Sequence, residues 1–156
     1  MAYAVLKSPL GTTIIEGDGN GISKMSFSEE IFEAEEIPGE LEAAAIQLQE
    51  YFEGKRKEFS LKLNPVGTDF QKKVWRELQK IPFGKTISYY ELAEKLGDVK
   101  AIRAVAAANG KNPLWLLVPC HRVIGSDGSL TGYAGGLWRK KWLLDHENPV
   151  KQVSLF

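Results

Sequence analysis

Cys120 and His121 are the two residues at which nucleophilic chemistry could begin. Cys120 is the only cysteine in the chain, and His121 is one of two histidines. A thiol attacks as its thiolate, and a neighbouring imidazole is a common base for forming the thiolate at neutral pH. A lone cysteine is nevertheless more often an inert apolar residue, and neighbouring side chains on an extended strand point to opposite sides. The pair alone leaves both interpretations open.

The residues around this pair narrow the choice. An apolar run at 114–118 predicts a buried extended segment, and Pro119 ends regular pairing just before the thiol. The motifs of this half are Ile87-Ser88-Tyr89, Arg103-Ala104-Val105, Asn112-Pro113, Pro119-Cys120-His121-Arg122-Val123, Gly132-Tyr133-Ala134-Gly135-Gly136-Leu137 and Asp145-His146-Glu147. Together they resemble the motifs of the O6-alkylguanine-DNA alkyltransferases, also called methylated-DNA–protein-cysteine methyltransferases. The N-terminal part resembles this family only in size and general organisation.

The resemblance implies a single-turnover, self-inactivating enzyme of direct DNA repair. An alkyl group, typically methyl, would pass irreversibly from O6 of guanine, and more weakly from O4 of thymine, to the sulfur of Cys120. His121 would act as the base through a water molecule, and Glu147 would orient His121. By the same resemblance Asn112 braces the cysteine turn, and Tyr89 offers a phenolic donor to the guanine. Arg122 is expected to hold the loop through carbonyls or a carboxylate.

The resemblance also implies binding to the minor groove of double-stranded DNA, largely independent of sequence, after which the base is flipped out. Arg103 would replace the extruded nucleotide in the duplex, and an ordinary surface arginine is the alternative. An alanine-rich helix face lets the backbone approach DNA closely. Burial of these alanines against other helices is the alternative. The residues assigned to this interface are Lys100, Ala101, Arg103, Ala104, Ala107 and Tyr89.

An extruded base needs a largely apolar slot with a few polar groups. Glycines in the wall of such a slot allow the backbone to approach the base closely. The residues assigned to the pocket are Tyr133, Ala134, Gly135, Gly136, Val123 and Trp138. Members of the family often carry serine where this chain has Ala134, so one possible hydrogen bond to the base is missing.

The sequence predicts neither a cofactor nor a metal site. It contains no Gly-x-Gly-x-x-Gly, no phosphate-binding loop and no closely spaced pairs of metal ligands. No apolar run approaches membrane-spanning length, so no membrane partner is expected. A single cysteine favours a reducing compartment such as the cytoplasm, with nucleoid association if the source is prokaryotic. A monomer is expected.

The formal net charge of zero conceals an asymmetry between the two halves. Residues 1–67 hold six basic and twelve acidic residues, whereas residues 68–156 hold fourteen basic and eight acidic residues. A basic surface attracts a polyanion, and an acidic one repels it. The C-terminal half is therefore the half expected to contact nucleic acid.

The order of predicted elements indicates an α+β protein with two domains. Residues 1–63 predict an antiparallel three-stranded sheet, with strands at 3–7, 12–16 and 22–27, followed by a helix from Gly39 to Gly54. The resemblance makes this domain ribonuclease H-like. Residues 64–156 predict a mostly helical, winged helix-turn-helix-like domain that binds DNA and accepts the alkyl group.

Two capping boxes begin helices in this second domain, one at Thr68 with Gln71 and one at Ser88 with Glu91. The first helix, to about residue 80, has its predicted apolar face at Phe70, Val74, Trp75 and Leu78. The second, to about residue 96, is followed by a helix at 100–109, a spacing that also recurs in proteins that never bind DNA. Asp127-Gly128 predicts a hairpin after Val123-Ile124. A helix at 137–147 closes the domain, and His146 is expected there as a cation favourable to the helix dipole.

Three other functional classes compete with alkyl transfer. A lesion-binding protein of the same scaffold would lack the nucleophile, but Cys120 is present. A helix-turn-helix regulator with a structural cysteine would carry more base-reading side chains on its second helix. A thiol hydrolase would require an oxyanion hole, which no sequence pattern reveals. Alkyl transfer is the interpretation that accounts for the most motifs.

Overall fold

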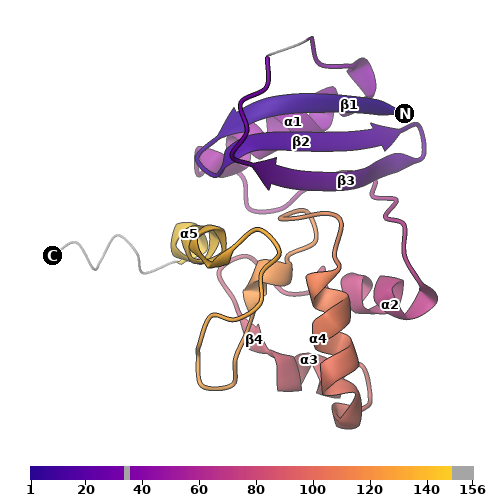
Figure 1. Ribbon diagram of the computed structural model, residues 1–156, viewed down its shortest axis with the longest axis vertical. Helices are drawn as coiled ribbons and strands as arrows, with labels where there is room; N and C mark the ends of the chain where they lie inside the picture. The colour runs from indigo at the N-terminus through magenta and orange to yellow at the C-terminus, as the bar shows by residue number, and fades with distance from the viewer. Residues whose placement is uncertain (34–35, 149–156) are drawn as a thin grey trace, which may run out of the picture. The chain divides into compact units, whose positions relative to one another are not determined.

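The computed structural model describes residues 1–33 and 36–148 and has an α+β fold, as predicted (Figure 1). The chain forms two compact units. The first contains Met1–Val66 together with Pro113–Leu117, and the other described residues form the second. The first unit is therefore discontinuous in sequence, and the domain boundary at 63/64 stays a prediction. Within the described ranges, no helix is long and apolar enough to cross a membrane.

The first unit is built on the predicted antiparallel sheet of β1 (Ala2–Ser8), β2 (Gly11–Asp18) and β3 (Gly21–Ser28), in that order (Figure 1). The β1–β2 turn is closed by Ser8, whose hydroxyl donates to the carbonyl of Gly11 at 2.9 Å. Gly11 has a φ of 106°, a left-handed conformation that glycine adopts without steric cost. Alternate residues of β2 and β3 are buried, which is the pattern of a sheet with one face in a core.

Helix α1 (Gly39–Phe52) packs against β1 and β2. Its buried residues are Leu41, Ala44, Ala45, Leu48 and Tyr51. The predicted apolar face ended in Phe52, which is only partly buried, whereas Tyr51 is fully buried. Both positions follow Leu48 at helical spacing, so the sequence pattern could not choose between them.

The apolar run at 114–118 is extended only at its start. The N–H of Met25 donates to the carbonyl of Pro113 at 2.9 Å, and the N–H of Trp115 donates to the carbonyl of Met25 at 3.0 Å, so this segment pairs with β3. Leu116 then reverses the chain with a φ of 72°. The prediction of burial is confirmed for every residue of the run except the partly buried Trp115, but a continuous extended segment is wrong because of this turn.

The second unit contains α2 (Asp69–Leu78), α3 (Tyr89–Lys95), α4 (Ile102–Gly110) and α5 (Leu137–Glu147). Both predicted capping boxes are present, at Thr68 and Ser88. A 3₁₀ turn, η1 (Val99–Ala101), leads into α4, so the α-helix begins two residues later than predicted. The indole N–H of Trp75 donates to the carbonyl of Ala108 at 2.9 Å and fastens α2 to α4. Phe70 is 41% exposed and does not belong to the apolar face predicted for α2.

A short parallel ladder joins β4 (Ile87–Ser88) to β5 (Val123–Ile124). β5 pairs with a strand from before α3 and with no antiparallel strand after it among the described residues, so of the predicted hairpin only the turn is found. The Asp127-Gly128 turn does form. The N–H of Gly125 donates to the carbonyl of Ser129, and the N–H of Gly128 donates to the carbonyl of Gly125. The ladder brings the start of α3 beside the chain that leaves Cys120.

Candidate active site

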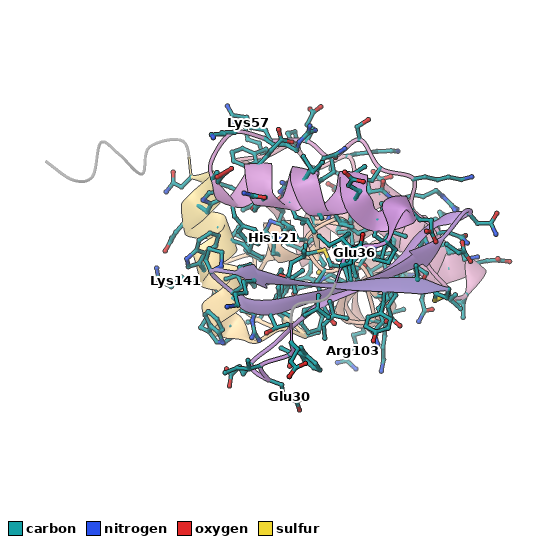
Figure 2. The ribbon with its side chains drawn as sticks, turned by 90° about the horizontal axis from the view of Figure 1, so that it is seen from above. Glu30, Glu36, Lys57, Arg103, His121 and Lys141 are labelled. Atoms are coloured by element: carbon teal, nitrogen blue, oxygen red, sulfur yellow. The ribbon has the colours of Figure 1, made fainter. Side chains whose placement is uncertain are left out.

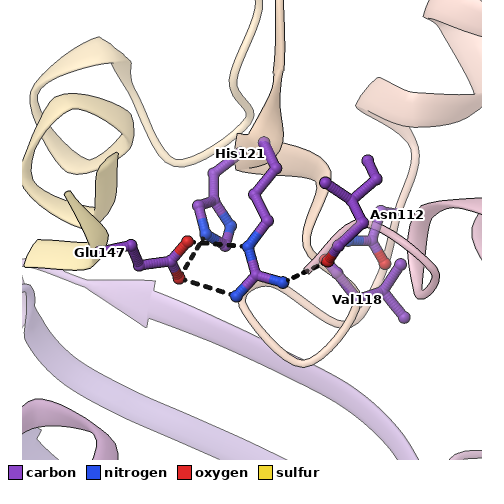
Figure 3. Close-up of polar contacts among 6 residues, drawn as sticks. Asn112, Val118, His121 and Glu147 are labelled. Carbon is purple, nitrogen blue, oxygen red and sulfur yellow. Dashed lines mark hydrogen bonds and ion pairs between the residues drawn. The ribbon is translucent and has the colours of Figure 1, made fainter. Parts of the chain in front are cut away.

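Cys120 lies in a 3₁₀ turn, η2 (Cys120–Arg122), and is almost completely buried. The turn begins where the N–H of Cys120 donates to the carbonyl of Val118 at 2.8 Å. The side-chain amide of Asn112 donates to the same carbonyl at 2.9 Å, so Asn112 fixes the approach to the thiol. This contact fits the bracing role expected of Asn112 (Figure 3).

His121 and Glu147 lie in direct contact, as Figure 3 shows. The Nε2 atom of His121 is 2.9 Å from a carboxylate oxygen of Glu147, and both side chains are buried. An ionised carboxylate only accepts hydrogen bonds, so Nε2 carries the proton and Nδ1 of a neutral ring keeps its lone pair. Nδ1 has no hydrogen-bond partner among the described residues. The imidazole is thus held in the tautomer that a general base requires.

Arg122 holds the carboxylate from the other side. Its Nε donates to one oxygen of Glu147 at 2.7 Å and its Nη2 to the other at 3.0 Å, while Nη1 donates to the carbonyl of Ile81 at 2.7 Å. Both expected kinds of partner, a carbonyl and a carboxylate, are present. Such a bidentate pair fixes the orientation of both groups.

The two members of the His121–Glu147 pair respond differently to burial. Burial lowers the pKa of His121, which outweighs the opposing effect of the Glu147 carboxylate and keeps the ring neutral. Burial would raise the pKa of Glu147, but the hydrogen bonds from His121 and Arg122 and the positive charge of Arg122 hold that pKa well below its usual range. The acid is therefore ionised beside a neutral imidazole.

Burial raises the pKa of the Cys120 thiol to about 11, against the lowering effects of the Asn112 side chain and of the charge on Lys140. A thiol of that pKa ionises in about one molecule in ten thousand at pH 7. The thiol therefore needs a base before it can attack. Lys140 was not among the residues predicted from sequence.

Tyr89 follows the capping residue Ser88 and is partly exposed. Its hydroxyl donates to the carbonyl of Thr131 at 3.0 Å. Burial raises the pKa of this phenol, while interactions with the side chains of Thr131 and Asn109 lower it. Asn109 is buried on α4 and is a second residue that sequence reasoning missed.

The residues assigned to the pocket divide into two groups. Tyr133, Gly135 and Val123 are buried, and burial raises the pKa of the Tyr133 phenol well above its usual value. Ala134 and Trp138 are exposed instead, and Trp138 stacks its indole under the guanidinium of Arg139 at 4.6 Å. Gly136, with a φ of 92°, turns the chain into α5. Tyr133 and Val123 are thus buried as the wall of a pocket would be, whereas Ala134 and Trp138 are exposed.

The residues assigned to DNA binding, apart from the partly exposed Tyr89 of α3, occupy one exposed side of α4 and of the turn before it. Arg103, Ala104, Ala107 and Lys100 are exposed, and Ala101 is partly exposed. Figure 2 shows the side chain of Arg103, which is exposed, whereas the side chain of His121 is fully buried. Val105 and Ala108 face the core, so the alternative of buried alanines holds for Ala108 but not for the assigned ones.

His146 lies near Glu147 in the sequence but contacts an aromatic ring. The His146 ring stacks on Trp142 with ring centres 4.9 Å apart, in the last turn of α5. Within residues 1–33 and 36–148, no three His, Cys, Asp or Glu side chains are arranged to hold a metal ion.

Comparison with known proteins covers nearly the whole chain. Residues 69–149 match the model for the DNA binding domain of 6-O-methylguanine DNA methyltransferase, and residues 1–65 match its ribonuclease-like domain. A methylated-DNA–protein-cysteine methyltransferase of Methanosarcina barkeri is 46% identical, over 94% of this chain and 97% of the relative. One from Mycobacterium bovis is 43% identical, over 98% and 96%.

Solved structures agree with these relatives. Mycobacterium tuberculosis OGT in complex with DNA superposes with a TM-score of 0.86 at 43% identity, covering 95% of this chain and 93% of that one. An O6-methylguanine DNA methyltransferase from Methanococcus jannaschii gives a TM-score of 0.68 at 29% identity, covering 93% of each chain. On this evidence the chain belongs to the family of the methylated-DNA–protein-cysteine methyltransferases, the 6-O-methylguanine DNA methyltransferases.

Proposed function

We propose that this protein repairs double-stranded DNA by moving an alkyl group from O6 of guanine, and more weakly from O4 of thymine, to Sγ of Cys120. The observation that carries the proposal is the buried thiol in the same turn as an imidazole whose tautomer is set by Glu147. A buried, protonated thiol with an oriented base beside it suits a nucleophile that is activated only when substrate arrives.

The proposed reaction exchanges one bond for another at the alkyl carbon. Nδ1 of His121 takes the thiol proton through a water molecule, and the thiolate sulfur attacks the carbon in line with the bond to O6. The carbon–oxygen bond breaks as the sulfur–carbon bond forms, and the guanine leaves with its electron pair and gains a proton in place of the alkyl group. A thiol and an alkylguanine thus become a thioether and guanine, and no group in the site can cleave the thioether.

The proposed DNA interface is the exposed side of α4. Its alanines permit close approach of the helix to the minor groove, and Lys100 is placed for a phosphate contact. Arg103 projects from the same side and would occupy the space of the extruded nucleotide. Extrusion costs roughly a few kcal/mol, and less for a damaged pair, which contributes to the selection of the lesion.

The proposed base pocket lies between Tyr89, Tyr133 and the start of β5 at Val123. The hydroxyl of Tyr89 donates to the carbonyl of Thr131, two residues before Tyr133, which supports placing both tyrosines around one pocket. Gly135 and Gly136 allow the backbone to approach the base, while the exposed Trp138 and Ala134 would lie at the rim. We further predict that the protein acts as a monomer with domains at 1–63 and 64–156. We predict that it acts in the cytoplasm or on the nucleoid.

The experiment that tests the function is the intact mass of the protein after mixing with a duplex that carries one O6-methylguanine. We expect a gain of one methyl group per protein molecule, on the peptide that contains Cys120, and no gain in Cys120→Ala. If wild type and variant bind the damaged duplex and neither gains mass, the protein is a lesion binder. Neither mass gain nor preference for the lesion would exclude both functions.

A further inference from the structure

Lys140 is a lysine whose side chain is completely buried in α5. Its Nζ donates to the carbonyl of Val123 at 2.6 Å and to the carbonyl of Thr131 at 2.7 Å. A buried ammonium is costly unless it is hydrogen-bonded, and both of these acceptors are neutral carbonyls. Lys140 thus places a positive charge in the interior of the protein, and the two hydrogen-bond acceptors of that charge are uncharged.

The two carbonyls belong to the two segments that border the thiol. Val123 directly follows the turn that contains Cys120, and Thr131 lies two residues before Tyr133. The carbonyl of Thr131 also accepts the hydroxyl of Tyr89, at 3.0 Å. One ammonium therefore ties together the cysteine turn, the start of the pocket wall and the tyrosine at the start of α3.

The charge of Lys140 acts on the same groups. The titratable groups that face it are Tyr89 of α3, whose ring centre is 5.8 Å from Nζ, and Cys120 and His121 of the cysteine turn. Burial lowers the pKa of Lys140 to about 8, so most of its molecules remain charged at pH 7. That charge opposes the effect of burial on the pKa of the thiol, and it adds a smaller contribution to the burial that lowers the pKa of His121.

We infer that Lys140 is a positioning residue of the alkyl transfer, which ties the pocket wall to the cysteine turn and stabilises the thiolate of Cys120 by its charge. The inference rests on the proposed function and deepens it. It assigns two separable roles to one side chain. The hydrogen bonds fix the distance between base pocket and sulfur, and the charge offsets part of the cost of ionising a buried thiol.

Three substitutions separate the two roles. Lys140→Met removes both the donors and the charge, Lys140→Gln keeps two N–H donors without the charge, and Lys140→Arg keeps both. Lys141→Met is the matched control, because Lys141 is the next residue, points away from α5 in Figure 2 and has a side chain that is 67% exposed. Thermal unfolding of each variant shows whether it folds.

The first readout is the single-turnover rate of methyl transfer from a duplex that carries O6-methylguanine, at saturating DNA. We expect Lys140→Met to slow transfer by about tenfold or more, since one unit in the thiol pKa changes the thiolate fraction tenfold. The affinity for the duplex should stay within about twofold, and Lys140→Arg should be the least impaired. Transfer by Lys140→Met at the wild-type rate would overturn the inference.

The second readout is the alkylation of Cys120 by iodoacetamide without DNA, between pH 6.5 and 9.5. We expect wild type to react about tenfold faster than Lys140→Met and Lys140→Gln at pH 6.5 to 7, where Lys140 is charged. The difference should vanish by pH 9.5, where Lys140 has lost its proton, and Lys140→Arg should stay fast throughout. A merely structural role gives no such convergence, so a ratio independent of pH, or equal rates throughout, would refute the effect of charge.

The second readout needs no substrate, so it separates the two proposals. If wild-type protein transfers no methyl group, the proposed function fails, and the alkylation rates still decide whether Lys140 tunes the thiol. If wild type transfers the group and the variants behave as Lys141→Met does, only the inference on Lys140 fails. Should Lys140→Met not fold, Lys140→Gln and Lys140→Arg supply the same comparison of charge.

Discussion

Glu147 both orients the imidazole of His121 and balances the charge of Arg122. One carboxylate accepts from His121 and twice from Arg122, so it fixes the tautomer of the base and balances a buried guanidinium at the same time. Removing the charge while keeping the shape would disturb both. The effect on the base is the more specific one, because an amide can donate to Nε2 and leave the proton on Nδ1.

We predict that Glu147→Gln slows methyl transfer by about a thousandfold, by analogy with the loss of the orienting acid in a triad. The same change should lower the free energy of unfolding by about 3 kcal/mol, because a buried guanidinium loses its counter-ion. Single-turnover rates and urea unfolding measure the two effects. Asp145→Asn on the same helix is the control, since the carboxylate of Asp145 is half exposed and pairs with the exposed Lys141, and it should change neither quantity appreciably.

The depressed pKa values of His121 and Glu147 also predict how stability depends on pH. Unfolded His121 binds a proton below about pH 6.5 and unfolded Glu147 below about pH 4.3, whereas the folded forms resist protonation. Stability contributed by each group is therefore complete above its unfolded pKa and is lost as the pH falls. Urea unfolding should show a first decrease between pH 7 and 5 that His121→Gln reduces. A variant that keeps the whole decrease would assign it to other groups.

At the scale of elements, two capping boxes offer a natural comparison. Thr68 begins α2, and Ser88 begins α3 immediately before Tyr89. Loss of either hydroxyl should cost about 1 kcal/mol of stability. We predict that only Ser88→Ala also slows methyl transfer, because the first turn of α3 positions Tyr89 against Thr131. Melting curves and single-turnover rates measured on both alanine variants test this, and equal rates would show that the cap does not govern Tyr89.

The alanine side of α4 gives a second prediction at this scale. Ala104 is exposed, so Ala104→Leu should leave the melting temperature nearly unchanged while weakening binding to duplex DNA by about tenfold or more through steric hindrance. Ala43→Leu, at an exposed position of α1, is the control and should bind as wild type does. Binding measured by fluorescence anisotropy would contradict the proposed interface if both variants bound equally well.

Sequence patterns predicted the helices and strands better than they predicted which strands pair. The helices, both caps and the antiparallel sheet follow from local spacing, which a sequence displays directly. The ladder between β4 and β5 joins residues 36 positions apart, and two-residue strands carry no periodicity, so a local hairpin was predicted instead. The reversal at Leu116 was missed because a branched apolar residue gives no sign of a left-handed φ.

The site shows the same division. Cys120, His121, Glu147 and Asn112 were found because a family motif contains them, and the structure brings them together, although their roles stay predictions. Lys140 lies between Arg139 and Lys141 in the sequence, and a run of three cations predicts a solvent-exposed helix face. Only the packing of α5 reveals that the middle one points inward, where two carbonyls receive it.

At the scale of the whole molecule, charge is divided along the chain, with the acidic excess before residue 68 and the basic excess after it. The proposed DNA interface belongs entirely to the basic part. Binding to a polyanion releases counter-ions in proportion to the phosphates contacted, so affinity should fall as salt rises. The slope of that fall counts contacts and is insensitive to the chemistry at Cys120.

We predict that Lys100→Gln reduces the slope of log affinity against log salt by about one, the value for one phosphate contact. Lys57→Gln removes the same charge from an exposed position in the acidic part and should leave the slope unchanged, although the net charge of the two variants is identical. Equal slopes for the two variants would mean that DNA responds to net charge rather than to a localised surface. A larger loss for Lys57→Gln would move the interface to the first unit, because only a contacting lysine changes the number of released ions.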